Sequence, residues 1–142
     1  MNPDDWRIFY KTAYEKLFRK VRDNGMKVFM HLCGNVIEII PDLIELGLDV
    51  LNPVQPQAMD IKELSERFGG KLCFYGGIDV QGTMIHGTPD DVRKEVNKLV
   101  DLFGCFNGGY ICSTSHSIMP ETPLDNIIAM FEAIKDVKYY AK

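Results

Sequence analysis

The chain has 142 residues, of which 46% are hydrophobic and 25% are charged, a composition typical of a globular domain. Its formal charge of −4 is spread over interleaved acidic and basic residues, so the sequence offers no basic face for a nucleic acid. The N-terminus MNPDD lacks the features of a signal peptide, and no apolar run approaches the roughly 18 residues that a membrane span needs, so we expect a single cytoplasmic domain over residues 1–142.

Helical and strand patterns alternate along the chain. Apolar residues at three- and four-residue spacing predict helices, and short apolar runs bounded by Gly or Pro predict strands. Asp60, Thr88 and Thr122 are expected to cap the last three helices, and Pro41 lies in the first turn of the second helix or kinks it. The predicted elements are a helix over about 9–23, a strand over 26–30, a helix over 36–46, a strand over 49–52, a helix over 61–68, a strand from 72 (LCFYGG), a helix from 88 to 103, a strand over 110–112 and a helix over 123–137. Beyond Lys138 we expect a loose tail.

The predicted strands are apolar throughout, which is typical of a parallel sheet buried on both faces. Each connection between them is long enough for a crossover helix, so the pattern predicts an α/β fold of the (βα)4 type. A closed TIM (β/α)8 barrel takes about 250 residues, and this chain has about half of that. We therefore expect half of a barrel, either as a piece of a larger barrel or closed by a second copy.

Right-handed crossovers place the C-terminal ends of all four strands at one rim of the sheet. The segments that follow the strands are HLCGN, NPVQPQ, GGIDVQG and CSTSHS. The polar and glycine-rich loops therefore gather on this rim, whereas the loops at the opposite end, such as DNG and GLD, are short. We expect any chemistry on the rim.

The segment VFMHLCGNV places His31 and Cys33 two residues apart at the end of an apolar run. Residues two apart on an extended strand point to the same side, so this imidazole and this thiol can face one ion. Both are good zinc ligands, and Gly34 lets the backbone approach a site without a side chain in the way. The same letters also fit a histidine bonded to a carbonyl group beside an inert thiol, and the spacing leaves both interpretations open.

A catalytic zinc commonly has three protein ligands, so a third would come from another loop of the rim. The candidates are His116, in the loop after the fourth strand, and Cys112, on the strand itself. In a flat sheet with about 4.8 Å between strands, the first and fourth strands would lie roughly 14 Å apart, so the sheet must curve and the loop must reach inward. This favours His116 over Cys112, for which packing in the strand is the simpler interpretation. His86 follows no strand end and is expected on a surface loop.

Polar side chains on the second and third loops are candidates for a substrate site. Asn52, Gln55 and Gln57 can hydrogen-bond a substrate, or satisfy backbone groups around the two prolines of their loop. Asp79, after Gly-Gly-Ile, provides a carboxylate beside a close approach of the backbone, or caps a turn that needs positive φ. Four cysteines occur at irregular spacing, and nothing suggests secretion, so free thiols or metal ligands are expected rather than disulfides.

Four segments in this order resemble the uroporphyrinogen decarboxylase (URO-D) superfamily: HLCGN, DVLNPVQP, FGGKLCFYGGIDVQG and SHSIMPETPLDNI. The resemblance runs from Trp6 to Val137 and corresponds only to the C-terminal half of the family's barrel. The superfamily also contains cobalamin-dependent methyltransferases, in which an H-x-C pair and a later cysteine bind zinc. His31 and Cys33 match the pair, and His116 stands where the later cysteine would be. A histidine here also resembles one in the decarboxylases, which use no metal.

The resemblance implies zinc-dependent methyl transfer between a methyl-corrinoid, or cobalamin, and a thiol or similar acceptor. The implied zinc ligands are His31, Cys33 and His116, and the implied catalytic groups are His116 and Asp79. The residues expected to bind substrate are Asn52, Gln55, Asp79 and Gln81. The partners implied are a small-molecule methyl donor or acceptor, a corrinoid protein and a second copy of the chain, with no nucleic acid and no membrane.

Two alternatives stay open. The chain is a decarboxylase of uroporphyrinogen, in tetrapyrrole and haem biosynthesis, with His116 as a substrate-binding or proton-relay group and Cys33 inert. Or it is a non-catalytic or self-associating fragment that keeps the rim motifs without a complete site, which the missing strands suggest. Fold resemblance does not fix a reaction, so the site has to decide among the three.

Overall fold

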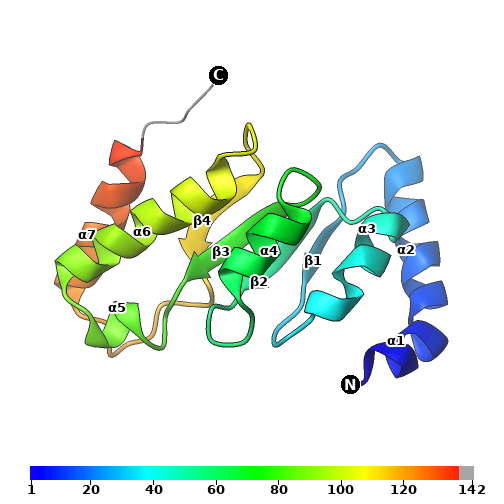
Figure 1. Ribbon diagram of the computed structural model, residues 1–142, viewed down its shortest axis with the longest axis horizontal. Coiled ribbons are helices and arrows are strands. Elements are labelled where there is room, and N and C mark those ends of the chain that lie inside the picture. Colours follow the sequence, from blue (N-terminus) through cyan, green and yellow to red (C-terminus); the bar gives the residue numbers. More distant parts are fainter. Residues whose placement is uncertain (138–142) are drawn as a thin grey trace.

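Four parallel strands form one sheet in the computed structural model, which describes residues 1–137 (Figure 1). The strands lie in sequence order, β1-β2-β3-β4, and all three neighbouring pairs are parallel. They are β1 (Phe29–His31), β2 (Val50–Val54), β3 (Cys73–Ile78) and β4 (Tyr110–Thr114). The (βα)4 half-barrel that the sequence predicts is confirmed. The tail from Lys138 onward lies outside the described residues.

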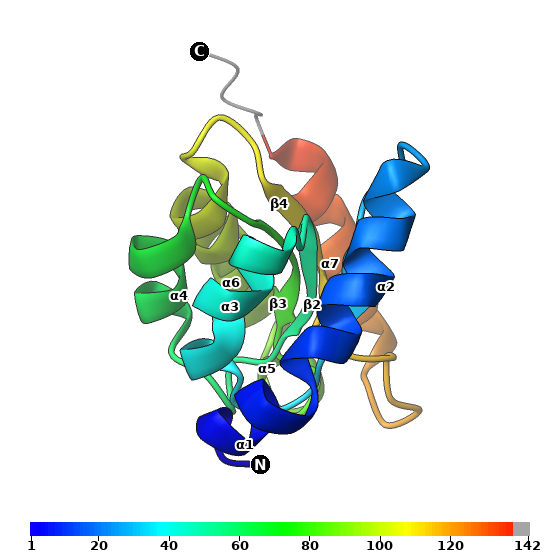
Figure 2. The same cartoon turned by 90° about the vertical axis from the view of Figure 1, so that its right-hand side faces the viewer.

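Helices cover one face of this sheet. In Figure 2, α3, α4 and α6 lie on one side of the sheet, while α2 and α7 extend past it on the other side. At the two ends of this helix layer, α2 contacts α3 and α7 contacts α6. The helices are α1 (Pro3–Phe9), α2 (Lys11–Asp23), the 3-10 helix η1 (Ile37–Ile39), α3 (Ile40–Leu46), α4 (Ile61–Phe68), α5 (Thr83–His86), α6 (Pro89–Gly104) and α7 (Leu124–Asp136).

Local side-chain chemistry explains where several helices begin and end. The Asp60 carboxylate accepts hydrogen bonds from two backbone N–H groups at the start of α4. Thr88 and Asp91 cap each other's backbone in a reciprocal capping box at the start of α6. Gly47, with φ of 97°, ends α3 in the left-handed conformation that glycine adopts at little cost. Pro41 lies in the first turn of α3, where no backbone N–H is lost.

The structure differs from the predicted elements in five places. The helix predicted over 9–23 is α2, which begins at Lys11, and it is preceded by α1, which was not predicted. The first turn of the second predicted helix is the 3-10 helix η1, and the predicted strand at 26–30 is shifted to Phe29–His31. His86 is exposed, as expected, but ends the short helix α5 rather than lying in a loop. Thr122 does not cap α7, since Pro123 holds the cap position and the buried Thr122 hydroxyl has no hydrogen-bond partner in the described part of the chain.

The core lies between the sheet and its helix layer. Leu51 of β2 and Phe74 of β3 are almost fully buried there, as are Leu43, Leu64 and Leu99 of the covering helices. The opposite face of the sheet is open and apolar. It exposes Phe29 and Ile111 by 51% and 45%, and a closed barrel would bury such a face. The open face and the rim therefore carry the features that packing within this chain does not explain.

Candidate functional site

The ends of the strands bring the rim loops together. The side chain of Gln55, after β2, accepts a hydrogen bond from the backbone of Gly34, after β1, at 2.6 Å. The loop after β3 is joined to the loop after β2 by a bond of 2.6 Å from Gln57 Nε2 to Asp79 Oδ2. The loop after β4 is tied to β3 through Ser115 N and the carbonyl oxygen of Ile78, 2.8 Å apart. The rim is thus one continuous surface, as the parallel topology requires.

His31 and Cys33 lie side by side at the end of β1. His31 Nε2 is 3.2 Å from Cys33 Sγ, and both residues are exposed. On its other side, the ring places Nδ1 2.7 Å from Oδ1 of Asn52, the residue that pairs with His31 across β1 and β2. Asn52 Nδ2 donates to the carbonyl oxygen of Tyr75 at 3.4 Å, which fixes the amide with its oxygen toward the imidazole.

The Asn52 contact indicates the tautomer of His31. An amide oxygen can only accept a hydrogen bond, so Nδ1 must carry the proton. In the neutral ring Nε2 then keeps its lone pair, and that lone pair faces the Cys33 sulfur. An outer amide that orients a histidine in this way is the arrangement found around metal-binding histidines. The pair therefore presents one nitrogen and one sulfur donor to the same point, a set that suits zinc.

His116 lies near this pair, but the three side chains do not form a finished cluster. The rings of His31 and His116 are edge to face with centroids 6.5 Å apart. Both line a cavity of about 280 Å³, together with Asn52 and Tyr75. Within residues 1–137, no group of three His, Cys, Asp or Glu side chains is arranged to hold a metal ion. The donor pair fits zinc, and a third donor from this chain would need His116 to turn toward it.

Cys112 is the less suitable of the two candidates for the third donor. It lies on β4, half-buried, and it does not line the cavity that His31 and His116 share. Burial raises the pKa of its thiol, which disfavours the thiolate that binds metal.

Gly34 was expected to allow a close approach of the backbone to a site. A Cβ at this position would instead meet nothing within 4 Å. Glycine is favoured here because its φ is +88°, in the left-handed region.

Asp79 is buried in the loop after β3 and has two hydrogen-bond donors. Its Oδ2 accepts from Gln57, and its Oδ1 accepts from the backbone N of Gln81 at 2.9 Å. A Cβ on Gly82 would stand 2.5 Å from Oδ2, so the loop folds tightly over the carboxylate. Asp79 thus caps a turn and also provides a fixed carboxylate at the edge of a cavity.

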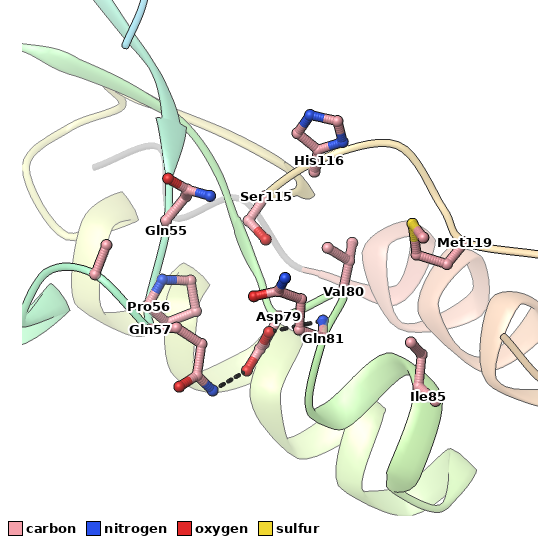
Figure 3. A pocket seen from close by; sticks show the side chains of 11 residues that line it. Gln55, Pro56, Gln57, Asp79, Val80, Gln81, Ile85, Ser115, His116 and Met119 are labelled. Carbon is pink, nitrogen blue, oxygen red and sulfur yellow. Dashed lines mark hydrogen bonds between the residues drawn. The ribbon is translucent and has the colours of Figure 1, made fainter. Parts of the chain in front are cut away.

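A larger cavity, of about 530 Å³, lies on the other side of His116. Figure 3 shows Gln57, Asp79 and Gln81 at one end of it and His116 at the other, with Val80 between them. Its volume falls in the range of small-molecule sites. His116 therefore borders both cavities. The residues that line the larger one are Gln55, Pro56, Gln57, Ala58, Asp79, Val80, Gln81, Ile85, Ser115, His116 and Met119.

Sequence reasoning missed Glu95 and Tyr110 beneath this cavity. Glu95 Oε1 accepts a hydrogen bond from the Asp79 backbone at 3.3 Å, while the buried Oε2 has no partner within hydrogen-bonding geometry among residues 1–137. Burial raises the pKa of Glu95. The signal was its position on the apolar side of α6, three residues after Val92 and four before Leu99. Tyr110 donates to the carbonyl oxygen of Gly76 at 2.7 Å, and burial raises its pKa. Its role in the core could not be told from sequence.

A third cavity, of about 660 Å³, opens on the far side of Cys33. It lies between α1–α2 and the loop after β1, and its aromatic lining comes from Trp6, Tyr10 and Tyr14. Cys33 is therefore approachable from this side as well. No helix of the described residues is both long and apolar enough to cross a membrane.

Comparison with protein families gives one match over nearly the whole chain. The model described as uroporphyrinogen decarboxylase (URO-D) matches residues 1–137. A uroporphyrinogen decarboxylase of Chlorobium phaeobacteroides is 27% identical, over 99% of this chain and 40% of its own length. A methylcobamide:CoM methyltransferase, MtaA, of Methanosarcina barkeri is 28% identical, over 99% of this chain and 38% of its own length.

A solved structure shows the same arrangement. A methyltransferase from Methanosarcina mazei superposes with a TM-score of 0.75 at 25% sequence identity, covering 96% of this chain and 38% of the other. The chain thus spans about two fifths of the length of the relatives that it matches. Decarboxylases and methyltransferases are both among them, so similarity alone does not select the reaction.

Proposed function

The chain belongs to the uroporphyrinogen decarboxylase family, and from this premise we propose that it provides the metal-binding half of a methyl-transfer site. The reaction is the transfer of a methyl group between a methyl-corrinoid and a thiol or similar small acceptor. The partners are that small molecule and a corrinoid protein. The similarity to two methyltransferases supports this reaction.

The observation that carries the proposal is the orientation of His31. Asn52 holds the proton on Nδ1, so Nε2 offers a lone pair toward the Cys33 sulfur, 3.2 Å away. A free nitrogen lone pair and a sulfur at one point are what two ligands of one zinc ion must offer. His31 and Cys33 are therefore proposed as two zinc ligands and His116, which can turn toward them across the smaller cavity, as the third.

When bound, zinc supplies the Lewis acidity that keeps an acceptor sulfur as its nucleophilic thiolate at neutral pH. The remaining work falls to the chain's own residues. Asn52 orients the imidazole of His31. His116 borders the larger cavity, where Gln55 and Gln81 offer amides to a substrate. Asp79 presents a carboxylate whose position is fixed by Gln57 and by the backbone of the next turn.

Metal analysis of the purified chain tests the proposal. After incubation with zinc and removal of the excess, the wild-type chain is expected to retain about one equivalent of zinc. Cys33→Ser is expected to lose it. Cys105→Ser is the matched control, because Cys105 is also an exposed free thiol but lies away from the rim. A chain that stays metal-free, or a Cys33→Ser variant that keeps its zinc, would refute the metal site.

The second candidate function is decarboxylation of a uroporphyrinogen-like tetrapyrrole. The position of His116 at the larger cavity, opposite Asp79, favours it, since an imidazole there can bind a substrate or relay a proton without metal. In this case Cys33 is inert. A metal-free chain that binds uroporphyrin, and whose His116→Ala variant does not, would support the decarboxylase and oppose the methyltransferase.

The third candidate is a non-catalytic or self-associating fragment. The exposed face of the sheet favours it, because Phe29 and Ile111 lack cover from the described residues. Light scattering gives the mass of the particle: a compact dimer would allow two copies to complete one barrel. A monomer with neither metal nor turnover of a methyl donor would remove both enzyme functions.

A further inference from the structure

The charge of the rim selects the class of substrate. We define the rim segments as residues 31–37, 52–60, 76–88 and 113–123, which follow the four strands. They contain three carboxylates and not one of the chain's 16 lysines and arginines. The carboxylates are those of Asp60, Asp79 and Glu121. A site that binds a carboxylate, sulfonate or phosphate normally supplies arginine or lysine, so this distribution points away from anionic substrates.

Two of the helix N-termini next to the rim, those of α4 and α6, already hold carboxylates of the chain, whereas α7, which begins after the fourth rim segment, has no side-chain cap but has Asp125 in its first turn. The N–H groups at the start of α4 donate to the carboxylate of Asp60. Those at the start of α6 lie in a capping box that includes the carboxylate of Asp91. Both helix ends therefore carry a negative side chain of their own, and neither is open to an anionic ligand.

The larger cavity has the opposite preference. Asp79 is buried, and within residues 1–137 its carboxylate takes part in no ion pair. Its two hydrogen bonds come from neutral donors, Gln57 and the backbone of Gln81. A carboxylate has about four acceptor positions, so acceptor capacity is left beside the cavity. Gln57 adds its own free amide oxygen, because its nitrogen is the atom that donates to Asp79.

The rest of this cavity fits a short alkyl group. Apolar side chains line it beside the polar floor: Val80 lies next to Asp79, and Met119 projects from the loop after β4 (Figure 3). Pro56, Ala58 and Ile85 extend the apolar lining. A ligand with a compact aliphatic part and one cationic hydrogen-bond donor satisfies both halves of the lining. A polycarboxylate satisfies neither.

We infer that the larger rim cavity takes an amine-bearing small molecule, with its ammonium group at Asp79 and its alkyl part against Val80 and Met119. The inference rests on the proposed function only in treating this molecule as the methyl donor or acceptor. A substrate with several carboxylates would have to be held by groups that this half of the site does not supply.

The test compares n-butylammonium with n-butyrate, which match in size and differ in charge. Titrations of the 15N-labelled chain are followed by NMR at the side-chain amides of Gln55, Gln57 and Gln81. Butylammonium is expected to bind at least about tenfold more tightly than butyrate, a difference that added salt reduces. Asp79→Asn keeps the oxygen that caps the turn but removes the charge, so it should abolish the difference. Asp101→Asn, on the outer surface of α6, should leave it unchanged.

Equal or tighter binding of butyrate overturns the inference, and so does the absence of shifts with either probe. Salt-insensitive selectivity in the wild-type chain also overturns it, whether or not the Asp79 variant folds. The zinc content of the same samples separates the two claims. Selectivity for the ammonium without bound zinc leaves the inference standing and refutes the methyltransferase, whereas bound zinc without selectivity does the reverse.

Discussion

Asn52 is the residue on which the proposed metal site most depends. It is not itself one of the proposed zinc ligands, yet its amide oxygen favours the proton on Nδ1 of His31. Outer residues of this kind typically contribute a factor of 10 to 100 in metal affinity. We therefore predict that Asn52→Ala weakens zinc binding by about that factor while the chain stays folded. Competition with a zinc chelator measures the affinity, and circular dichroism checks the fold.

Asn52→Asp is the matched control for Asn52→Ala. A carboxylate still accepts from His31 Nδ1 and raises the basicity of the ring, so zinc affinity should stay within about tenfold of wild type. If Asn52→Ala binds zinc as tightly as the wild-type chain, the orientation of His31 has no bearing on metal binding.

Glu95 makes stability depend on pH. Burial raises its pKa in the folded chain above the unfolded value of about 4.3. Above pH 4.3 the unfolded state releases this proton before the folded state does, so its contribution to the free energy of unfolding falls as pH rises through the folded pKa. Glu95→Gln removes that loss. The free energy of unfolding of the variant minus that of the wild type should therefore be larger at pH 7.5 than at pH 4, as measured by urea unfolding. The same difference at both pH values would contradict the raised pKa of Glu95.

At the scale of the element, the two threonines predicted at helix starts have different roles. Thr88 takes part in a capping box with Asp91, whereas the Thr122 hydroxyl is buried and finds no hydrogen-bond partner among the residues that the structure describes. Thr88→Ala should therefore lower the free energy of unfolding by about 1 kcal/mol. Thr122→Val keeps the shape and removes an unsatisfied hydroxyl, so it should be neutral or stabilising. Thermal unfolding of both variants measures this, and a larger loss at Thr122 would show that its hydroxyl has a partner after all.

The elements that sequence reasoning identified correctly are those with strong local signals. Asp60 and Thr88 mark helix starts, and Gly47 marks a helix end, because each acts on its own backbone neighbours. The signal for α1 was also present: Asn2 caps it through Asp4 N and Pro3 occupies its first turn. It was missed because the first helix was placed by apolar spacing, which begins only near Tyr10.

The site was predictable only where it depends on one strand. The two-residue period of an extended chain brings His31 and Cys33 together, and this could be read from the letters. The contact between His31 and Asn52 could not be predicted, because it depends on the register of β1 against β2. Glu95 was missed for the same reason, since its contact with the Asp79 loop depends on how α6 packs under β3.

On the scale of the whole molecule, the open face of the sheet needs a partner that covers it, and the order of the helices indicates what kind of partner this is. An eight-stranded barrel has eight helices around it. Two copies of this chain would bring α7 of one copy and α2 of the other to the same seam, because these helices stand at opposite ends of the sheet. A barrel with eight helices has room for only one helix at that junction. A complementary segment of four strands joined by three helices would instead complete the barrel.

We therefore predict that the chain alone does not form a closed two-copy barrel. Its open face should bind the dye ANS, and Phe29→Lys, on that face, should reduce the fluorescence several-fold without loss of stability. Lys16→Ala, on the exposed surface of α2, is the control. Sedimentation velocity checks the assembly: a compact dimer whose open faces no longer bind ANS would show that two copies do close the barrel.

X-ray absorption at the zinc edge tests the central claim most directly, because it reports the atoms around the metal. For the zinc-loaded chain we predict one sulfur at about 2.3 Å and two imidazole nitrogens at about 2.0–2.1 Å, with the sulfur lost in Cys33→Ser and one nitrogen lost in His116→Ala. A zinc shell made only of nitrogen and oxygen, and unchanged in both variants, would contradict the account.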